Sequence, residues 1–392
     1  MVVLGNILRA FPFLFILFSF VIGQILMPYV VSMAKKKNLI VRPNRRTSHE
    51  GGIPNIGGIN IFSSFIIPYL LFCTGTMDFY DRTVIAGMYT MLLIGFFDDM
   101  VELSALKKLL GEAIVGLIVI VISGKHLTSM FGLFGVNEIS AWVSYPLSLF
   151  VFLLIVNALN LVDGVDGLAS GLGILCCLFF GVYFQLAAGD VHHLDIYQLA
   201  SNQLRYIQLS MMAYALVGAL LIFFIYNVFG NKSKIFMGDS GALVLGFVIY
   251  LFVVEFCKIS EGATPNVSPY LLMKAAPIVA ICVLAIPLID TVRVMTTRIK
   301  KGNSPFKADR NHVHHLLLST GLKHRQVTFI LLGVNLFFIV LGLFIRNFQI
   351  EIAAIIVIVC ATVLTLILWR IVDKNITAKK IENEKQNTII TE

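Results

Sequence analysis

Four clusters of polar residues stand at the edges of long apolar runs, and their side chains are of kinds that bind cations and phosphates. They are the pair Asp98-Asp99, the run from Asn157 to Gly167, the run from Phe236 to Asp239, and the run from His312 to His315. A carboxylate close to hydrocarbon is costly unless a cation or a function compensates for it. Because this cost recurs at several boundaries, we expect the clusters to form one shared site.

Asp98 and Asp99 carry adjacent carboxylates, which repel each other unless a cation, a basic partner or a shared proton relieves them. In a soluble protein such a pair is usually a solvated helix end. This chain has only 22 acidic residues, and acids at a membrane edge are scarce. We therefore favour a functional role for the pair.

The second cluster spaces Asn157, Asn160, Asp163 and Asp166 three residues apart. This spacing keeps the side chains on one slowly drifting face of a helix. Carboxylate and amide oxygens form a hard donor set that suits Mg²⁺, a cation usually held by few protein ligands plus substrate phosphates. The alternative is an Asx-rich turn that caps the next helix. This cluster is the most specific of the four and predicts a magnesium site.

The other two clusters carry side chains that could contact a base, or phosphate and sugar oxygens. Asp239 stands where a helix begins and could be its N-cap, but Phe236 beside a metal-binding acid could also stack on a base. His312, His314 and His315 could bind a transition metal, or donate hydrogen bonds to phosphate and sugar oxygens. The Asp and Asn side chains nearby suit a hard cation better than zinc. We therefore prefer anion and sugar contacts, with an ordinary exposed loop as the alternative.

The elements that must position these clusters are apolar helices. The chain has 392 residues, of which 58% are hydrophobic and 13% charged, and its mean hydropathy is +0.89. Spanning segments satisfy their own backbone hydrogen bonds, so this composition indicates an all-α polytopic membrane protein. We expect one integral membrane domain over residues 1–373 and a polar cytoplasmic tail over residues 374–392. The six cysteines form no CxxC pair and predict neither a zinc site nor a disulfide framework.

The apolar runs predict about eleven transmembrane helices. The runs are Phe11–Val31, Ile59–Thr74, Val84–Phe97, Leu109–Ile122, Trp142–Val156, Leu168–Ala188, Ile207–Tyr226, Ala242–Phe256, Leu271–Ile289, Val327–Ile345 and Ile352–Trp369. Their sequences differ from one another, so they give no sign of the inverted repeats common in transporters.

The placement of lysine and arginine predicts the orientation in the membrane. With the N-terminus outside, the inner segments carry 23 of the 30 basic residues. The seven left outside are Arg9, Arg82, Lys125, Arg205, Lys258, Lys274 and Arg346. This split puts the C-terminus and all four polar clusters on the cytoplasmic side, so cytoplasmic loops would form the active site. The net charge of +8 then reflects topology and gives no evidence for nucleic-acid binding.

These motifs, in this order, resemble those of the polyprenyl-phosphate N-acetylhexosamine-1-phosphate transferases, a superfamily that includes the WecA/TagO-type enzymes and MraY. The resemblance covers roughly residues 10–345 and all five inner loops. The run from Pro287 through Arg298 to His315 is similar to the WecA/TagO branch, whereas MraY-type chains carry a proline-led histidine run there. A UDP-N-acetylhexosamine donor is therefore implied instead of an MraY-like peptidyl-sugar substrate.

The resemblance implies transfer of N-acetylhexosamine-1-phosphate, above all GlcNAc-1-phosphate, from its UDP-sugar to undecaprenyl phosphate. UMP would be released, and the product would start lipid-linked cell-envelope polysaccharide synthesis at the bacterial inner (cytoplasmic) membrane. Mg²⁺ is the implied cofactor, for which Mn²⁺ can substitute. The implied partners are the UDP-sugar, the polyprenyl lipid and the membrane, with no nucleic acid. A homodimer is left open.

The resemblance also assigns roles to individual residues in the polar clusters. It implies catalytic roles for Asp98, Asp99 and Asp163, magnesium coordination by Asn160 and Asp239, a uridine pocket at Asp166 and Phe236, and contacts with phosphates and amino sugar by Lys108, Arg310, His312, His314 and His315. It does not decide whether an aspartate of the first pair acts as a base or only orients the acceptor phosphate.

Three other classes of protein also place acids in membranes. An ion-coupled transporter with a carboxylate relay predicts acids near mid-helix, whereas these lie at helix ends, and it leaves the histidine run unexplained. An intramembrane aspartyl protease needs a Gly-x-Gly-Asp context, and the Gly238-Asp239 pair lacks the first glycine. The CDP-alcohol phosphotransferase pattern also fails, because Asp163-Gly164 is not followed by its Ala-Arg pair. The transferase is therefore the favoured interpretation.

Overall fold

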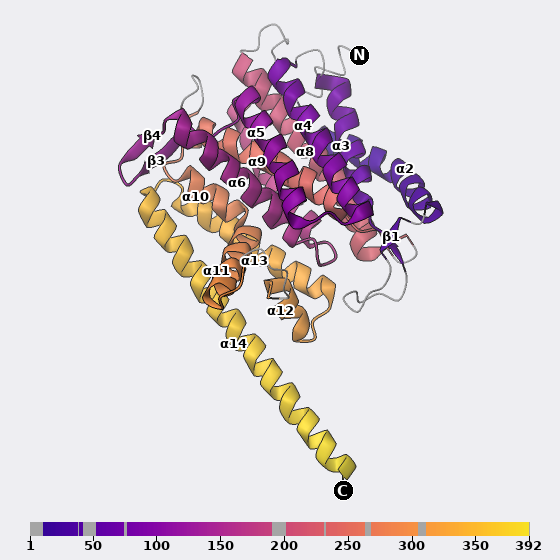
Figure 1. Cartoon of the computed structure of the whole chain (residues 1–392). Coiled ribbons are helices and arrows are strands. Elements are labelled where there is room, and N and C mark those ends of the chain that lie inside the picture. The colour runs from indigo at the N-terminus through magenta and orange to yellow at the C-terminus, as the bar shows by residue number, and fades with distance from the viewer. Residues whose placement is uncertain are drawn as a thin grey trace.

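The computed structural model describes residues 11–37, 39–41, 52–73, 77–189, 201–230, 233–262, 268–304 and 311–391, with the backbone alone for residues 41, 201 and 375–391. Helices make up most of this part of the chain (Figure 1). They are α2 (Leu14–Lys36), α3 (Gly57–Cys73), α4 (Phe79–Val101), α5 (Ala105–Ser123), α6 (Ala141–Leu161), α7 (Leu168–Ala188), α8 (Ser201–Phe229), α9 (Gly238–Ser260), α10 (Ala276–Val283), α11 (Ala285–Lys300), α12 (Val313–Ser319), α13 (His324–Ile345) and α14 (Ile350–Thr391), with a short 3₁₀ helix at Pro269–Leu271.

Each of the eleven predicted apolar runs overlaps a helix or, in one case, a bent pair of helices. Within the described residues, eight helices are long and apolar enough to cross a bilayer, or nine when the bent pair counts as one span. Of the others, α3 is apolar but has 17 residues, and α5 carries Lys107, Lys108 and Glu112. The chain is thus an all-α polytopic membrane protein. The number of eleven spans and their orientation stay predictions.

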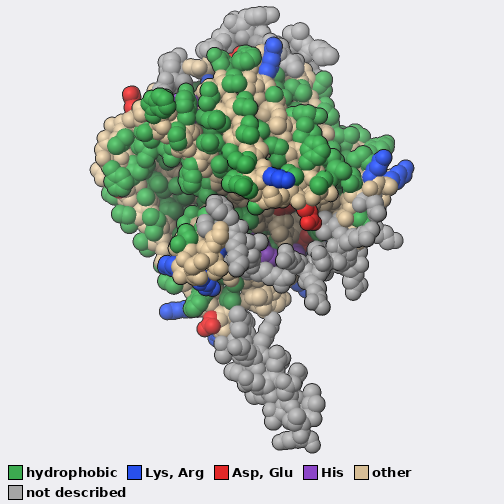
Figure 2. Space-filling model, in the orientation of Figure 1, with side chains coloured by type: hydrophobic (Ala, Val, Ile, Leu, Met, Phe, Trp, Pro, Cys, Tyr) green, Lys and Arg blue, Asp and Glu red, His purple; other side chains and the backbone are tan. Residues whose placement is uncertain are grey.

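The surface of the bundle agrees with a membrane environment. Hydrophobic side chains cover most of the face seen in Figure 2, while acidic (red) and histidine (purple) side chains come together at its lower edge. Large apolar side chains such as Trp142, which is 91% exposed, stand on this surface. An apolar surface of this extent needs lipid to cover it.

The run Leu271–Ile289, predicted as one candidate membrane helix, is not a single unbroken helix in the structure. The chain forms α10 and α11 instead, which meet at 87°. Pro287 removes a backbone N–H near the start of α11. Asn335 of α13 satisfies freed groups at the break, because its Nδ2 donates to the Val283 carbonyl at 3.0 Å and its Oδ1 accepts the Ile286 N–H at 3.1 Å. A buried amide thus stabilises the bend among apolar side chains.

Helix α9 lies at the centre of the bundle and α14 lies at its edge. In the most apolar stretch of α9 94% of the residues are buried, against 11% in α14. Helices α4, α6, α3 and α7 pack around α9. Figure 1 shows α14 leaving the bundle as a long helix that ends at the C-terminus. The predicted boundary between membrane domain and tail, at residues 373 and 374, falls inside this helix.

Two small antiparallel hairpins were not predicted. Strand β1 (Ile40–Val41) pairs with β2 (Ile53–Pro54), and β3 (Ser129–Leu133) pairs with β4 (Val136–Glu138). The end of the first hairpin is hydrogen-bonded to the segment before α9. The Phe236 N–H donates to the Pro54 carbonyl at 2.8 Å, and the Gly57 N–H donates to the Phe236 carbonyl at 2.9 Å. The loop before α3 therefore runs beside the loop before α9.

Candidate active site

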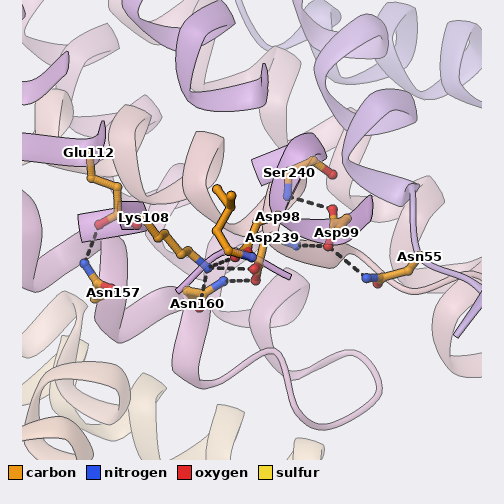
Figure 3. A network of polar contacts seen from close by, with 10 residues as sticks. Asn55, Asp98, Asp99, Lys108, Glu112, Asn157, Asn160, Asp239 and Ser240 are labelled. Atoms are coloured by element: carbon orange, nitrogen blue, oxygen red, sulfur yellow. Dashed lines mark hydrogen bonds and ion pairs between the residues drawn. The ribbon is translucent and has the colours of Figure 1, made fainter. Parts of the chain in front are cut away.

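A lysine ammonium lies at the centre of the polar cluster (Figure 3). Lys108 Nζ is 2.9 Å from Asp98 Oδ2 and 2.6 Å from Asp239 Oδ2. It is also 3.5 Å from Asn160 Oδ1, and Asn160 Nδ2 donates to Asp239 Oδ1 at 2.5 Å. Oxygen atoms from three helices therefore converge on one cation.

The direction of the helices explains why these residues meet. Asp98 lies in the last turn of α4 and Asn160 in the last turn of α6. Lys108 lies in the first turn of α5 and Asp239 in the first turn of α9. Two helices end where two others begin, so side chains at these four ends share one space. The predicted convergence of three separate sequence clusters is thus present in the structure.

The neighbouring aspartates of the first cluster have different surroundings. Asp99 Oδ1 accepts a hydrogen bond from Asn55 Nδ2 at 2.8 Å and another from the Asp239 N–H at 2.8 Å. Its Oδ2 accepts the Ser240 N–H at 3.1 Å. Asp99 therefore caps the N-terminus of α9 from another helix, where backbone N–H groups lack intrahelical partners. Asp98 instead faces the lysine.

Gly238 permits this close approach. Its φ is +71°, a conformation that favours glycine, and a Cβ there would lie 2.6 Å from Asp99 Oδ2.

Asp163 lies near the same backbone. Burial and the carboxylates of Asp239 and Asp99 raise the pKa of Asp163 well above its ordinary value, while a hydrogen bond from the Gly238 N–H opposes that shift. Several carboxylates thus share a small space in which a second cation would relieve their repulsion.

A buried acid beside the cluster was missed by the sequence analysis. Glu112 of α5 has 0% exposure and lies one turn after Lys108. Its Oε2 accepts a hydrogen bond from Asn157 Nδ2 at 2.6 Å (Figure 3), whereas its Oε1 has no hydrogen-bond partner in the part of the chain that the structure describes. The only signal in the sequence was a lone acid within an apolar run. Asn157, an amide of the second cluster, is thus bound to this acid.

The residues assigned to the uridine pocket share one lysine. Lys234 Nζ is 2.7 Å from Asp166 Oδ2 and 5.7 Å from the centroid of the Phe236 ring. Asp166 follows α6 and Phe236 precedes α9, so the lysine links two of the predicted clusters. Lys234 was not among the residues assigned to the site.

The histidine cluster lies against the loop between α6 and α7. His314 is 1% exposed, and its Nε2 is 3.1 Å from the position of a Cβ on Gly164. The rings of His312 and His314 are nearly parallel with centroids 5.7 Å apart, and those of His314 and His315 are 4.3 Å apart. Burial and the neighbouring His315 lower the pKa of His314 to about 3, so this imidazole is neutral near pH 7. Arg310 lies outside the described residues.

The donor set of the centre fits a hard divalent cation. Carboxylate oxygens of Asp98 and Asp239 and the amide oxygen of Asn160 point at one position, where the structure has a lysine ammonium. Among the described residues, no group of three His, Cys, Asp or Glu side chains is arranged to hold a metal ion. Mg²⁺ takes few protein ligands and completes its octahedron with water and substrate phosphates, and the two carboxylate oxygens and one amide oxygen of this centre are ligands of that kind.

The fold and the site together define a polytopic membrane protein whose polar centre, at the ends of four helices, suits a divalent cation and phosphate groups. Residues 82–257 match the family described as glycosyl transferase family 4. The chain is 32% identical to the undecaprenyl-phosphate alpha-N-acetylglucosaminyl 1-phosphate transferase of Escherichia coli over 300 residues, which are 75% of this chain and 73% of the relative.

Proteins of the same name from Yersinia pestis and Pasteurella multocida are 30% and 28% identical to it over 297 residues. The matches cover 75% of this chain and, respectively, 73% and 75% of the relatives. The chain belongs to this family of transferases. The family inferred from the sequence motifs is thereby confirmed.

Proposed function

We propose that this protein transfers GlcNAc-1-phosphate from UDP-GlcNAc to undecaprenyl phosphate and releases UMP. The observation that carries the proposal is the convergence of Asp98, Asp239 and Asn160 on one cation position, in a chain that resembles transferases named for this reaction. The product would start a lipid-linked polysaccharide of the cell envelope.

The reaction exchanges one phosphorus–oxygen bond for another. An oxygen of the acceptor phosphate attacks the β-phosphorus of the nucleotide sugar and forms the new diphosphate bond. The bond from this phosphorus to the oxygen that bridges to the α-phosphorus breaks, and UMP leaves with that oxygen and its electron pair. Catalysis of such a step is mainly positioning and neutralisation of charge. Because a phosphate monoester has a second pKa of about 6, the acceptor is already largely ionised at neutral pH and needs no strong base.

The residues of the centre have the surroundings that this reaction needs. Asp98 faces the cation position, where it can orient the acceptor phosphate or take its residual proton. Lys108 brings a positive charge to the same place and can pair with a phosphate. Asp99 acts through the start of α9, whose first residues it holds. Asn160 and Asp239 would hold Mg²⁺, or Mn²⁺ in its place, and the cation would neutralise the diphosphate.

The other predicted residues surround this centre and would bind the donor. Asp166 and Phe236 would contact the uridine, and Asp163, whose carboxylate is close enough to interact with those of Asp239, Asp99 and Asp166, would take part in catalysis. The amino sugar and diphosphate would be bound by His312, His314, His315 and Arg310. We place this site on the cytoplasmic side of the bacterial inner membrane, because the basic residues of the sequence concentrate on the segments that carry it.

The test is a transfer assay with purified protein, undecaprenyl phosphate, Mg²⁺ and a panel of UDP-sugars labelled in the sugar. We expect label in the lipid extract with UDP-GlcNAc, one UMP released per lipid labelled, and loss of both with EDTA. No labelled lipid with any UDP-sugar would defeat the proposal. Sugar uptake into proteoliposomes without UMP release would support the transporter instead.

A further inference from the structure

The first residues of the histidine cluster are held by a buried carboxylate on α11. Asp290 has a side chain that is 3% exposed, and its Oδ2 lies 2.9 Å from His312 Nδ1. Its Oδ1 accepts the Val313 N–H at 3.0 Å, the first residue of α12. One carboxylate therefore binds the ring of the histidine and caps the helix that follows it.

A second side chain of α11 completes this contact. Arg293 Nη2 donates to Asp290 Oδ1 at 2.7 Å and also to the Asn311 carbonyl. Together the two side chains hold residues 311, 312 and 313 in sequence. Helix α11 in turn begins at the bend that Asn335 stabilises. The position of His312 is thus fixed to the bundle through α11, although the histidine itself belongs to a loop.

The contact with Asp290 also decides which ring nitrogen of His312 can act on a ligand. A carboxylate only accepts hydrogen bonds, so Nδ1 must carry a proton to pair with it. In the neutral ring the lone pair is then at Nε2, the nitrogen farther from the backbone. Histidines that bind metals are oriented by a partner on the second nitrogen in the same way, and loss of that partner typically costs about 10–100-fold in affinity or activity.

We propose that Asp290 is the positioning residue of the histidine cluster: it holds His312 with the proton on Nδ1 and presents Nε2 to the UDP-sugar. This inference rests on the proposed function, in which His312 contacts the donor substrate. A loop anchor with no other role would affect only folding. A positioning residue changes how the donor binds, and it does so through His312 alone.

The first experiment needs no activity. Nitrogen NMR of the full-length protein with isotope-labelled histidine distinguishes the two neutral forms of the ring, and the signal lost in His312→Gln assigns this residue. We expect a protonated Nδ1 in the wild type and a shifted signal in Asp290→Asn. A proton on Nε2 of neutral His312 in the wild type would overturn the inference, whether or not any variant folds.

The second experiment is a double-mutant cycle on transfer kinetics with Asp290→Asn and His312→Gln. We expect Asp290→Asn to lower kcat/KM for UDP-GlcNAc by about 10–100-fold while the KM for undecaprenyl phosphate is unchanged. In the His312→Gln background, adding Asp290→Asn should lower kcat/KM for UDP-GlcNAc by a further factor of less than about three. If the losses in kcat/KM of the two single variants multiply in the double variant, the inference is overturned. It is also overturned if Asp290→Asn loses thermal stability while its kinetics are unchanged.

The matched control is Asp78→Asn. Asp78 is also an aspartate that caps a helix, since it accepts the Asp81 N–H at 2.8 Å, but it lies at the end of α4 away from Asp98. We expect unchanged kinetics and an unchanged His312 signal. A wild-type protein that transfers no sugar phosphate would refute the proposed function, while the NMR result would still decide the state of His312.

Discussion

Replacing each aspartate of the Asp98-Asp99 pair by asparagine should separate their roles. Asp99 accepts three hydrogen bonds, two of them from backbone N–H groups at the start of α9. An asparagine has one acceptor oxygen, and its amide N–H₂ would face donors. Asp98 accepts one backbone hydrogen bond, from Leu103 at 2.7 Å, which an asparagine oxygen can keep. Asp98 also forms an ion pair with Lys108 and a side-chain hydrogen bond with Asp239.

The magnitudes follow from these contacts. Leaving a buried donor without an acceptor costs about 1–3 kcal/mol, so Asp99→Asn, which offers one acceptor oxygen to three donors, should lower the free energy of unfolding by about 2–4 kcal/mol after relaxation. The melting temperature should fall by about 2–5 °C in a chain of this length. Asp98→Asn should change stability by about 1 kcal/mol, because Lys108 keeps its pairing with Asp239. It should lower kcat by about 100-fold or more, since it removes charge from the reaction centre.

Thermal unfolding in detergent and the lipid-labelling assay measure both effects on the same preparations. Asp78→Asn serves as the control for removal of an acidic group from α4. The reasoning fails if Asp99→Asn melts like the wild type while Asp98→Asn is strongly destabilised. It also fails if Asp98→Asn keeps full turnover, which would exclude Asp98 as base or as orienting group.

Three further changes test other parts of the site. Lys108→Met leaves Asp98 and Asp239 without their cation, so Mg²⁺ should raise the melting temperature more in this variant than in the wild type; an equal rise would contradict the assignment of the cation position. Because the pKa of His314 is about 3 in the folded protein, below its unfolded value of about 6.5, protonation of the unfolded chain should cost about 2 kcal/mol of stability between about pH 7 and pH 5. His314→Gln should flatten that pH dependence of melting, and an unchanged slope would refute this origin. Gly238→Ala should cost about 1–3 kcal/mol through its positive φ and its contact with the carboxylate of α4, measured as a fall in melting temperature; wild-type melting would show that the start of α9 can relax.

The sequence predicted the helices because hydropathy depends on residue type, and it singled out candidate site residues for the same reason, whose roles stay predictions. Acids and amides at the ends of apolar runs stand out in the sequence. Because a carboxylate near hydrocarbon is costly at each of these ends, we expected Asp98, Asn160 and Asp239 to converge in one shared site. Their partners could not be predicted. That Asp99 would cap α9, or that Lys108 would lie between two acids, depends on contacts between residues far apart in the chain.

Two structural features were missed for similar reasons. The break between α10 and α11 depends on Asn335 of α13, whose amide replaces backbone partners around Pro287, and hydropathy alone does not reveal such a pairing. Asp290 appeared only as part of a motif, because a single acid in an amphipathic stretch gives no sign of the loop that it holds. Local patterns predict elements and candidate residues, whereas long-range hydrogen bonds assign what each residue does.

The most direct test of the account follows the β-phosphorus of UDP-GlcNAc. With that atom radiolabelled and with undecaprenyl phosphate and Mg²⁺ present, the account predicts that the label enters the lipid extract and that the UMP released is unlabelled. Label retained in released UDP, with sugar alone passing to the lipid, would contradict transfer of a sugar phosphate.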